Sequence, residues 1–474
     1  MSKNGNYKGR AIMGVIWSGV ERFSVQIIQF VVSVILARLL MPDDFGLIAI
    51  VLVFTVIFQT LNEAGLGTAL IHKQDRDEID FSTIYYTAIL VGVVSYLIVF
   101  LISGPIANYY QQPTLKPVMR LAGLSLIANS FAIVPIAKFT ISVDFKNMAK
   151  ASLWAALLSG VIGIIYAYLY RNVYAIVVQS LLYAFLNSFF VTIKLRYLPQ
   201  LQFSLSRFKI LFSYAYKLVL ARLVTVIYDD IYSLFIGKYF TPQVLGFYNR
   251  ANSFTSVSSR NIIYIVQRVS IPVLCENQHS KEAMANTLLL YMKYTAIIVY
   301  PLTAGIMILG EPLIEVLLTE KWLASAEILY YICPSCFLFL ICTFNRNIYN
   351  ATGRTDLALK AELIKKTFFL FVFFISLQFG FKGILMGQLI NSFIELLFDT
   401  HYVNKQIDLT LIEQLRSLWL IIMSTCIMGI GIYGLIQFLQ SSQLKLVLGT
   451  FVGVIIYAIC CHLFKLLDIR KILL

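Results

Sequence analysis

Long apolar stretches, separated by short polar segments, run through this chain from end to end. A stretch of about 20 apolar residues is the length that an α-helix needs to cross the hydrocarbon core of a bilayer. Scanning for such stretches predicts about fourteen spanning helices and an all-α integral membrane protein. Their approximate limits are 11–36, 45–70, 82–103, 118–137, 151–170, 173–193, 211–237, 244–272, 287–309, 325–347, 359–379, 383–403, 415–438 and 446–464.

One arrangement of charge, proline and glycine occurs twice along the chain. Each copy has an arginine inside a long apolar stretch, a basic residue at its end and then a Pro-x-x-x-Gly turn. Such a repeat in a membrane chain predicts a transporter of two lobes. Arg22, Arg38, Pro42 and Gly46 recur as Arg222, Lys238, Pro242 and Gly246, 200 residues later. We expect an N-terminal lobe over 1–196, a cytoplasmic linker over 197–210, a C-terminal lobe over 211–404 and two further helices over 405–474.

The distribution of lysine and arginine predicts the orientation in the membrane. Most of these residues fall in the loops on the amino-terminal side, and cytoplasmic loops carry such an excess. We therefore expect a multi-pass protein with both termini in the cytoplasm. Lys3, Lys8 and Arg10 precede an apolar stretch that continues past Trp17 and Glu21 to about Ala37. That stretch is too long for a cleavable signal, so it is interpreted as the first span.

Composition excludes several other classes of protein. Hydrophobic residues make up 59% of the chain and charged residues 13%, about half the charged share of a soluble domain. The net charge of +14 is spread along the loops, without the basic run that a nucleic-acid partner would need. There is no nucleotide-binding loop and no cluster of His, Cys or Asp with metal-ligand spacing. We therefore expect no cofactor and no metal.

Polar residues inside the spans carry the candidate chemistry, because they are costly in hydrocarbon and usually face a bundle interior. Arginines in the first, seventh and eighth spans exceed the carboxylates needed to neutralise them. Arg binds phosphate oxygens in bidentate fashion, so a pyrophosphate is a natural ligand for them. The structural alternative stays open, because Arg222 and Asp229 are seven residues apart and could form a buried ion pair. The inward-facing arginines are Arg22, Arg222, Arg250 and Arg268, and the neutral polar cavity residues are Gln29, Asn62, Asn261 and Asn391.

Several segments resemble a known family of transporters. They are Trp17-Ser-Gly-Val-Glu-Arg-Phe, Leu36-Ala-Arg-Leu-Leu-Met-Pro-Asp-Asp-Phe-Gly46, Asn62-Glu-Ala-Gly-Leu-Gly67 and Gly246-Phe-Tyr-Asn-Arg250. They are similar to segments of polysaccharide flippases of the O-antigen, Wzx or WzxC-like type. Those proteins belong to the multidrug/oligosaccharidyl-lipid/polysaccharide exporter superfamily. Beyond about residue 280 the resemblance is one of architecture.

This resemblance implies a fold like that of the multidrug exporters, with two six-helix lobes in the same orientation around a central cavity. It implies an undecaprenyl-pyrophosphate-linked oligosaccharide as substrate, moved to the periplasmic leaflet of a bacterial inner membrane by alternating access. A role in lipopolysaccharide or O-antigen biosynthesis follows, and a polymerase or chain-length regulator as partner stays open. The four arginines would then bind the pyrophosphate. The candidates for coupling to protons or sodium are Glu63, Asp229, Asp230, Glu395 and Asp399.

Two alternatives remain. A drug/cation antiporter of the same superfamily would need an anionic cavity, which the excess of arginine argues against. A membrane enzyme such as a polymerase or ligase would need acid, base or nucleophilic groups on a substantial external loop. The longest external loop, about 310–325, offers only Glu311, Glu315 and Glu320. We therefore expect a transporter and not an enzyme.

Overall fold

The computed structural model describes residues 3–466, and every regular element in this range is helical. Side chains at 3–16, 18, 20, 22, 63, 64, 214, 217, 221, 350 and 355–359 lie outside the description. The helices of the first half are α1 (Lys3–Leu39), α2 (Pro42–His72), α3 (Glu78–Tyr109), α4 (Leu115–Ser130), α5 (Ile133–Ser142), α6 (Phe145–Tyr170), α7 (Tyr174–Leu195) and α8 (Leu205–Tyr239). Those of the second half are α9 (Pro242–Thr255), α10 (Asn261–Glu276), α11 (Lys281–Ile308), α12 (Gly310–Leu318), α13 (Ala324–Ala351), α14 (Thr355–Leu377), α15 (Gly380–Ile407), α16 (Leu411–Gln437) and α17 (Ser442–Leu463).

Each predicted spanning stretch lies on one helix or on consecutive helices, so the all-α membrane fold is confirmed. The stretch 118–137 falls on α4 and α5, which are bent by 41°, and α8 is itself bent by 44° after Ser213. The stretch 244–272 falls on α9 and α10, which are joined by the π-helical segment Ser256–Arg260. Among the described residues, nine helices are long and apolar enough to cross a membrane, or up to eleven if each bent pair is one span.

The chain divides into two compact units, Met1–Gly246 and Phe247–Leu474, called unit 1 and unit 2 below. Unit 1 therefore holds α8 as well as α1 to α7, because α8 packs along α2. The predicted lobes divide earlier, at 197–210. The units are defined by contacts within the structure, whereas the lobes are defined by a repeat in the sequence. The lobe boundaries therefore stay a prediction.

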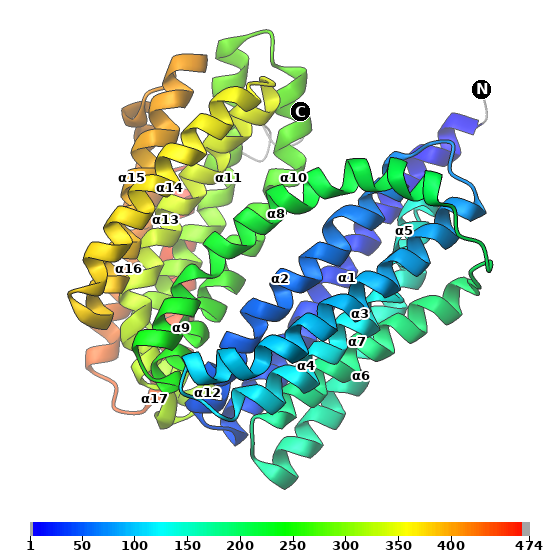
Figure 1. Ribbon diagram of the computed structural model, residues 1–474. Helices are drawn as coiled ribbons and strands as arrows, with labels where there is room; N and C mark the ends of the chain where they lie inside the picture. Colours follow the sequence, from blue (N-terminus) through cyan, green and yellow to red (C-terminus); the bar gives the residue numbers. More distant parts are fainter. Residues whose placement is uncertain (1–2, 467–474) are drawn as a thin grey trace. The chain divides into compact units, whose positions relative to one another are not determined.

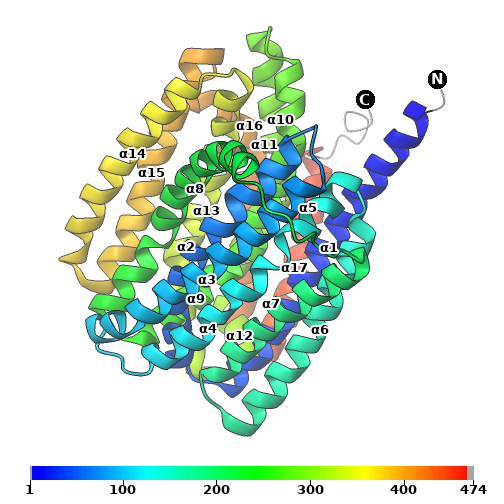
Figure 2. The same ribbon diagram turned by 45° about the vertical axis from the view of Figure 1, so that its right-hand side comes forward.

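In unit 1, α6 packs between α1 and α7, while α3 packs against α4 and α2 (Figures 1 and 2). Glycines allow close helix contacts, as is usual in membrane bundles. A Cβ on Gly160 of α6 would contact the side chain of Val32 on α1, and one on Gly163 would contact Gln179 on α7. A second group of buried residues, including Leu66 and Phe81, joins α2 and α3 to α5. Unit 1 is thus a tightly packed helix bundle.

In unit 2, α13 is the central helix and contacts α10, α11 and α15. Its core includes Met292 and Tyr300 of α11 with Phe344 of α13, all of them buried. The paired helices α14 and α15 lie side by side in Figures 1 and 2, and α16 pairs with α17.

The two Pro-x-x-x-Gly turns each begin a helix, α2 at Pro42 and α9 at Pro242. Proline suits the first helical position, because the N–H that it lacks would have no partner there. A Cβ on Gly46 would overlap the carbonyl group of Pro242, and a Cβ on Gly246 would overlap that of Pro42. The two copies of the sequence repeat therefore contact each other through equivalent residues, inside unit 1.

Candidate functional site

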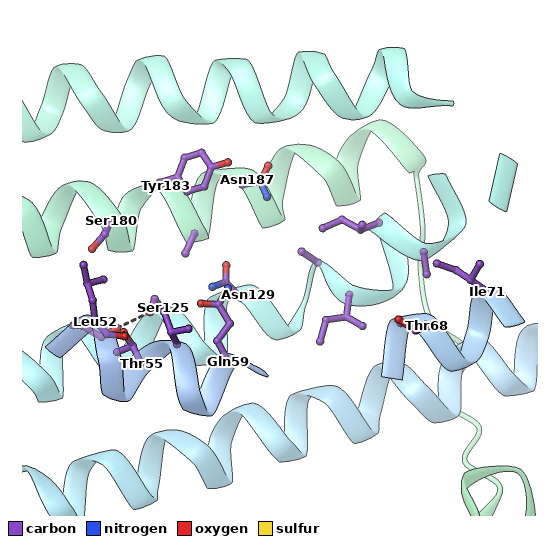
Figure 3. A pocket seen from close by; sticks show the side chains of 18 residues that line it. Leu52, Thr55, Gln59, Thr68, Ile71, Ser125, Asn129, Ser180, Tyr183 and Asn187 are labelled. Carbon is purple, nitrogen blue, oxygen red and sulfur yellow. Dashed lines mark hydrogen bonds between the residues drawn. The ribbon is translucent and has the colours of Figure 1, made fainter. Parts of the chain in front are cut away.

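Unit 1 contains a cavity of about 520 Å³ between α2, α4, α5 and α7 (Figure 3). A cavity of this volume lies in the range of small-molecule sites, which is roughly 300–1,000 Å³. Its lining is mixed, with apolar side chains and a set of uncharged polar ones. The polar lining residues are Thr55, Gln59, Thr68, Ser125, Asn129, Ser180, Tyr183 and Asn187.

Helical periodicity gathers most of these polar groups on one part of the wall. Residues three, four or seven positions apart share a face of an α-helix, which brings Ser125 beside Asn129 and Ser180 beside Tyr183 and Asn187. Figure 3 shows these five residues together with Thr55 and Gln59, while Thr68 and Ile71 lie toward the other end of the cavity. The cavity therefore has a polar part and an apolar part.

The serine and threonine hydroxyl groups of the polar part donate to carbonyls of their own helices. Thr55 donates to the carbonyl of Val51 at 3.1 Å, and Ser125 donates to the carbonyl of Ala122 at 2.7 Å. A hydroxyl that donates once still has lone pairs that can accept. Oδ1 of Asn187 is buried and has no hydrogen-bond partner among the described residues. The wall thus offers unused acceptors to a ligand.

The apolar part lies toward the end of α2 at His72. There Ile133 of α5 belongs to the same buried cluster as Leu66 and Leu70 of α2. The cavity is open along α2, since Leu52 keeps 49% of its surface exposed and Ile71 37%. None of the described lining residues is charged.

Unit 2 contains a second polar feature, a group of ion pairs between α13, α14 and α15, of which one pair is buried. Nζ of Lys365 lies 2.8 Å from Oδ1 of Asp399 and 2.6 Å from Oε1 of Glu362. Both Lys365 and Asp399 are almost completely buried. Nη1 of Arg346 lies 3.8 Å from Oε2 of Glu395. Opposite charges buried together satisfy one another, and breaking one pair leaves an uncompensated charge. This group, called the unit 2 ion-pair cluster below, ties three helices together.

A third group of charges joins the α2–α3 turn to the start of α8. Asp80 accepts from Lys73 at 2.6 Å and from Arg207 at 3.3 Å, and Arg207 also lies 3.1 Å from Asp77. Asp77 caps α3 by accepting from the backbone N–H of Asp80 at 3.0 Å. This hydrogen bond, together with the charge of Arg207, holds the pKa of Asp77 below its ordinary value.

The predicted anion-binding arginines have different surroundings. Arg250 of α9 is buried, with its guanidinium carbon 5.4 Å from the centre of the Trp322 ring. Arg222 of α8 and Arg268 of α10 are exposed. The side chain of Arg22 lies outside the described residues. Their common role stays a prediction.

The other predicted residues are also dispersed. Asn62 of α2 is buried and donates to the carbonyl of Ala88 on α3 at 3.2 Å, so it links two helices and does not line the cavity. Glu395 and Asp399 belong to the unit 2 ion-pair cluster. The remaining residues are Gln29 and Asp229, which are exposed, Asn261 and Asp230, which are partly buried, Asn391, which is buried, and Glu63, whose side chain is outside the description.

Sequence reasoning missed two groups of residues. Arg346 and Lys365 lie inside predicted spans, and a cation within an apolar stretch is itself a signal of a buried partner. Asn129, Tyr183 and Asn187 are also inside spans, but a single amide or phenol per turn does not reveal which helices share a cavity. Only the packing of α4 against α7 brings them together.

Comparison with known proteins gives consistent matches. The profile of a family described as "Polysaccharide biosynthesis protein" matches residues 35–327. The chain is 25% identical over 352 residues to the teichuronic acid biosynthesis protein TuaB of Bacillus subtilis (strain 168), covering 73% of this chain and 72% of TuaB. It is 21% identical to the lipopolysaccharide biosynthesis protein WzxC of Escherichia coli (strain K12), covering 87% of this chain and 84% of WzxC.

Solved structures show the same fold. The lipid II flippase MurJ, in an inward closed conformation, matches with a TM-score of 0.78 at 16% identity, covering 97% of this chain and 100% of that chain. An inward-facing multidrug exporter of the MATE family matches with a TM-score of 0.61 at 13% identity, covering 83% of this chain and 98% of that one. The predicted fold and the predicted relationship to polysaccharide transporters are thus confirmed, and the relatives are named for transport and biosynthesis of polysaccharides.

Proposed function

Because the chain belongs to the polysaccharide biosynthesis protein family, we propose that it is a flippase that moves a lipid-linked oligosaccharide from one membrane leaflet to the other. The substrate is an oligosaccharide on undecaprenyl pyrophosphate, as in the assembly of lipopolysaccharide and related polymers. The observation that carries this proposal is the family match, which extends over 35–327 and thus over helices of both units. The similarity of the fold to that of a lipid II flippase agrees with it.

We also propose an orientation in the membrane and a direction of transport. The chain is a multi-pass membrane protein, and we place it in the bacterial inner membrane with both termini in the cytoplasm. The positive-inside distribution of lysine and arginine supports this orientation. The substrate is then taken up at the cytoplasmic face and released at the periplasmic face by alternating access. A polymerase or chain-length regulator would receive the product there.

Binding of the pyrophosphate is assigned to the four arginines, Arg22, Arg222, Arg250 and Arg268. Support comes from Arg250. Burying a guanidinium group in a membrane protein has a high desolvation cost, so such a group usually has a binding partner or a function. A guanidinium group also matches two phosphate oxygens in geometry. The neutral residues Gln29, Asn62, Asn261 and Asn391 would complete the polar path.

Coupling to an ion gradient is assigned to the unit 2 ion-pair cluster. Asp399 holds Lys365 at 2.8 Å, and Glu395 lies 3.8 Å from Arg346, so protonation of either carboxylate would weaken a link between helices. Such a link is a natural two-state element. Glu63, Asp229 and Asp230 are the other candidates, and they lie in unit 1.

A drug/cation antiporter is less well supported. A cationic drug would need carboxylates in its cavity, and the described lining of the unit 1 cavity is uncharged. The family match also concerns polysaccharide biosynthesis and not drug export.

Complementation tests the proposal. A strain that lacks its own flippase should regain surface polysaccharide when it expresses this chain together with the matching glycosyltransferases. Arg250→Ala and Arg222→Ala should abolish the polymer and leave lipid-linked repeat units on the cytoplasmic face. Arg250→Lys, which keeps the charge, and Arg416→Ala on α16, outside the proposed path, serve as controls. Normal polymer levels from all the Arg→Ala variants would contradict the assignment of the arginines, and no polymer from the wild-type chain would contradict the function.

A further inference from the structure

We propose that the unit 1 cavity binds an uncharged sugar ring of the lipid-linked glycan. This inference rests on the proposed function and adds to it a subsite for the glycan, beside the arginines proposed to hold the pyrophosphate. It assigns the glycan to side chains of α2, α4 and α7 within one unit.

The described part of the lining suits a neutral ligand. The described residues around the cavity include amides, hydroxyls and one phenol, without an acid or a base. Glu21, a carboxylate on α1, accepts from Ser152 of α6 at 3.0 Å and is not part of the lining. A pyrophosphate or a cationic drug would therefore find no opposite charge on this described wall, whereas a sugar ring needs none.

The hydrogen-bonding groups suit a ring with several hydroxyls. Asn129 and Asn187 each present a donor and an acceptor, and the hydroxyls of Thr55 and Ser125 retain lone pairs after donating to their own helices. Oδ1 of Asn187 is buried without a partner among the described residues, which is unfavourable for a polar atom. A sugar hydroxyl would remove that cost.

The position of the polar part also points to a ligand. Thr55 and Gln59 lie near the middle of α2, which runs from Pro42 to His72, so this part of the cavity is at the depth of the hydrocarbon core. Polar side chains at that depth are expensive and usually serve a function. Tyr183 adds an aromatic face, which can pack on the apolar face of a sugar ring.

A lipid chain is a poorer occupant. Hydrocarbon would fill the part beside Ile71 and Ile133, but it would leave the amides of Asn129 and Asn187 without partners. Burying an unpaired amide is unfavourable. A sugar ring matches the polar part, and the open side along α2 gives it a route of entry.

Two lipid probes test the inference with the full-length protein in nanodiscs. One is undecaprenyl pyrophosphate, and the other is the same lipid with one N-acetylglucosamine. Native mass spectrometry measures the binding of each. The wild type should bind the glycosylated lipid more tightly. In Asn129→Leu/Asn187→Leu that preference should fall by about tenfold, since two neutral hydrogen bonds together contribute of the order needed for such a factor.

Controls separate this subsite from the fold and from the proposed function. Asn108→Leu at the exposed end of α3 makes the same chemical change outside the cavity and should keep the preference. If the double variant also fails to bind the bare lipid, the preference is measured instead in the milder variants Tyr183→Phe and Ser180→Ala. Equal binding of both lipids by the wild type, or an unchanged preference in the cavity variants, would overturn the sugar subsite. Failure of the wild type to bind either lipid would instead contradict the proposed function.

Discussion

The carbonyl group of Pro242 occupies the space that a side chain on Gly46 would need, and Pro42 stands in the same relation to Gly246. These are the residues that the 200-residue repeat relates to one another. Each helix start therefore packs its backbone directly on the backbone of its counterpart, and any residue larger than glycine would force the two apart.

The first prediction concerns this contact. Gly46→Ala and Gly246→Ala should each destabilise the protein by about 1–3 kcal/mol, the usual cost of overpacking. Thermal unfolding in nanodiscs measures the change. Gly104→Ala is the matched control, because a Cβ at Gly104 of α3 meets nothing within 4 Å. A loss of stability at Gly104 equal to that at Gly46 would show that the reciprocal contact is not the cause.

The second prediction concerns the buried pair of Lys365 and Asp399. Lys365→Met should destabilise unit 2 by about 3–5 kcal/mol, because it leaves Asp399 buried without its cation. Lys365→Met/Asp399→Leu should recover much of the loss, since both charges are then removed. A double-mutant cycle from thermal unfolding measures the coupling. Lys366→Met, at the next residue on α14, is the control. Additive effects of Lys365→Met and Asp399→Leu on the free energy of unfolding would refute the pairing.

The third prediction concerns pH. The pKa of Asp77 is lowered in the folded protein, so its ionised form stabilises the fold above the unfolded pKa, near 3.8. This contribution should be lost as the pH falls from that value through the lower folded pKa. We expect the drop in Tm between pH 7 and about pH 3 to be smaller in Asp77→Asn, whose side chain also caps a helix but does not titrate. An identical drop in both proteins would contradict the role of Asp77.

The fourth prediction concerns orientation. Nζ of Lys281 lies 2.9 Å from Oδ2 of Asp408, so the α10–α11 and α15–α16 loops are on the same side of unit 2, as the predicted topology requires. Lys281→Cys should react with a membrane-impermeant maleimide only after the cells are permeabilised. Lys116→Cys, at the start of α4, should react in intact cells. Both are made in a Cys426→Ser background, since Cys426 is exposed. Labelling with the reverse pattern would invert the topology.

The helices themselves could be predicted well. Each apolar stretch became a helix or a helix pair, because a backbone in hydrocarbon must satisfy its own hydrogen bonds. The hydropathy pattern did not indicate the bend between α4 and α5 or the bend within α8. The break between Ser130 and Ile133 lies within one predicted span and has a local cause in Pro135, which lacks the N–H that a continuous helix would donate to the carbonyl of Phe131.

The candidate site could be predicted only in part. Glu395 and Asp399 were selected because carboxylates are rare in membrane spans, but their cations, Arg346 and Lys365, come from two other helices. The polar stripe with Thr55 and Gln59 is visible on one helix, whereas its partners Asn129 and Asn187 are more than sixty residues away along the chain.

The sequence by itself determined the class of protein and its all-helical character, because hydropathy is a local property of each segment and a segment in a bilayer must satisfy its own backbone hydrogen bonds. The tertiary structure decided which polar groups pair and which line a cavity. Lys365 finds Asp399, Asn62 finds Ala88, and Asn187 faces a cavity, because helix packing sets each of these neighbours. A spacing along one helix cannot specify what the next helix presents to it.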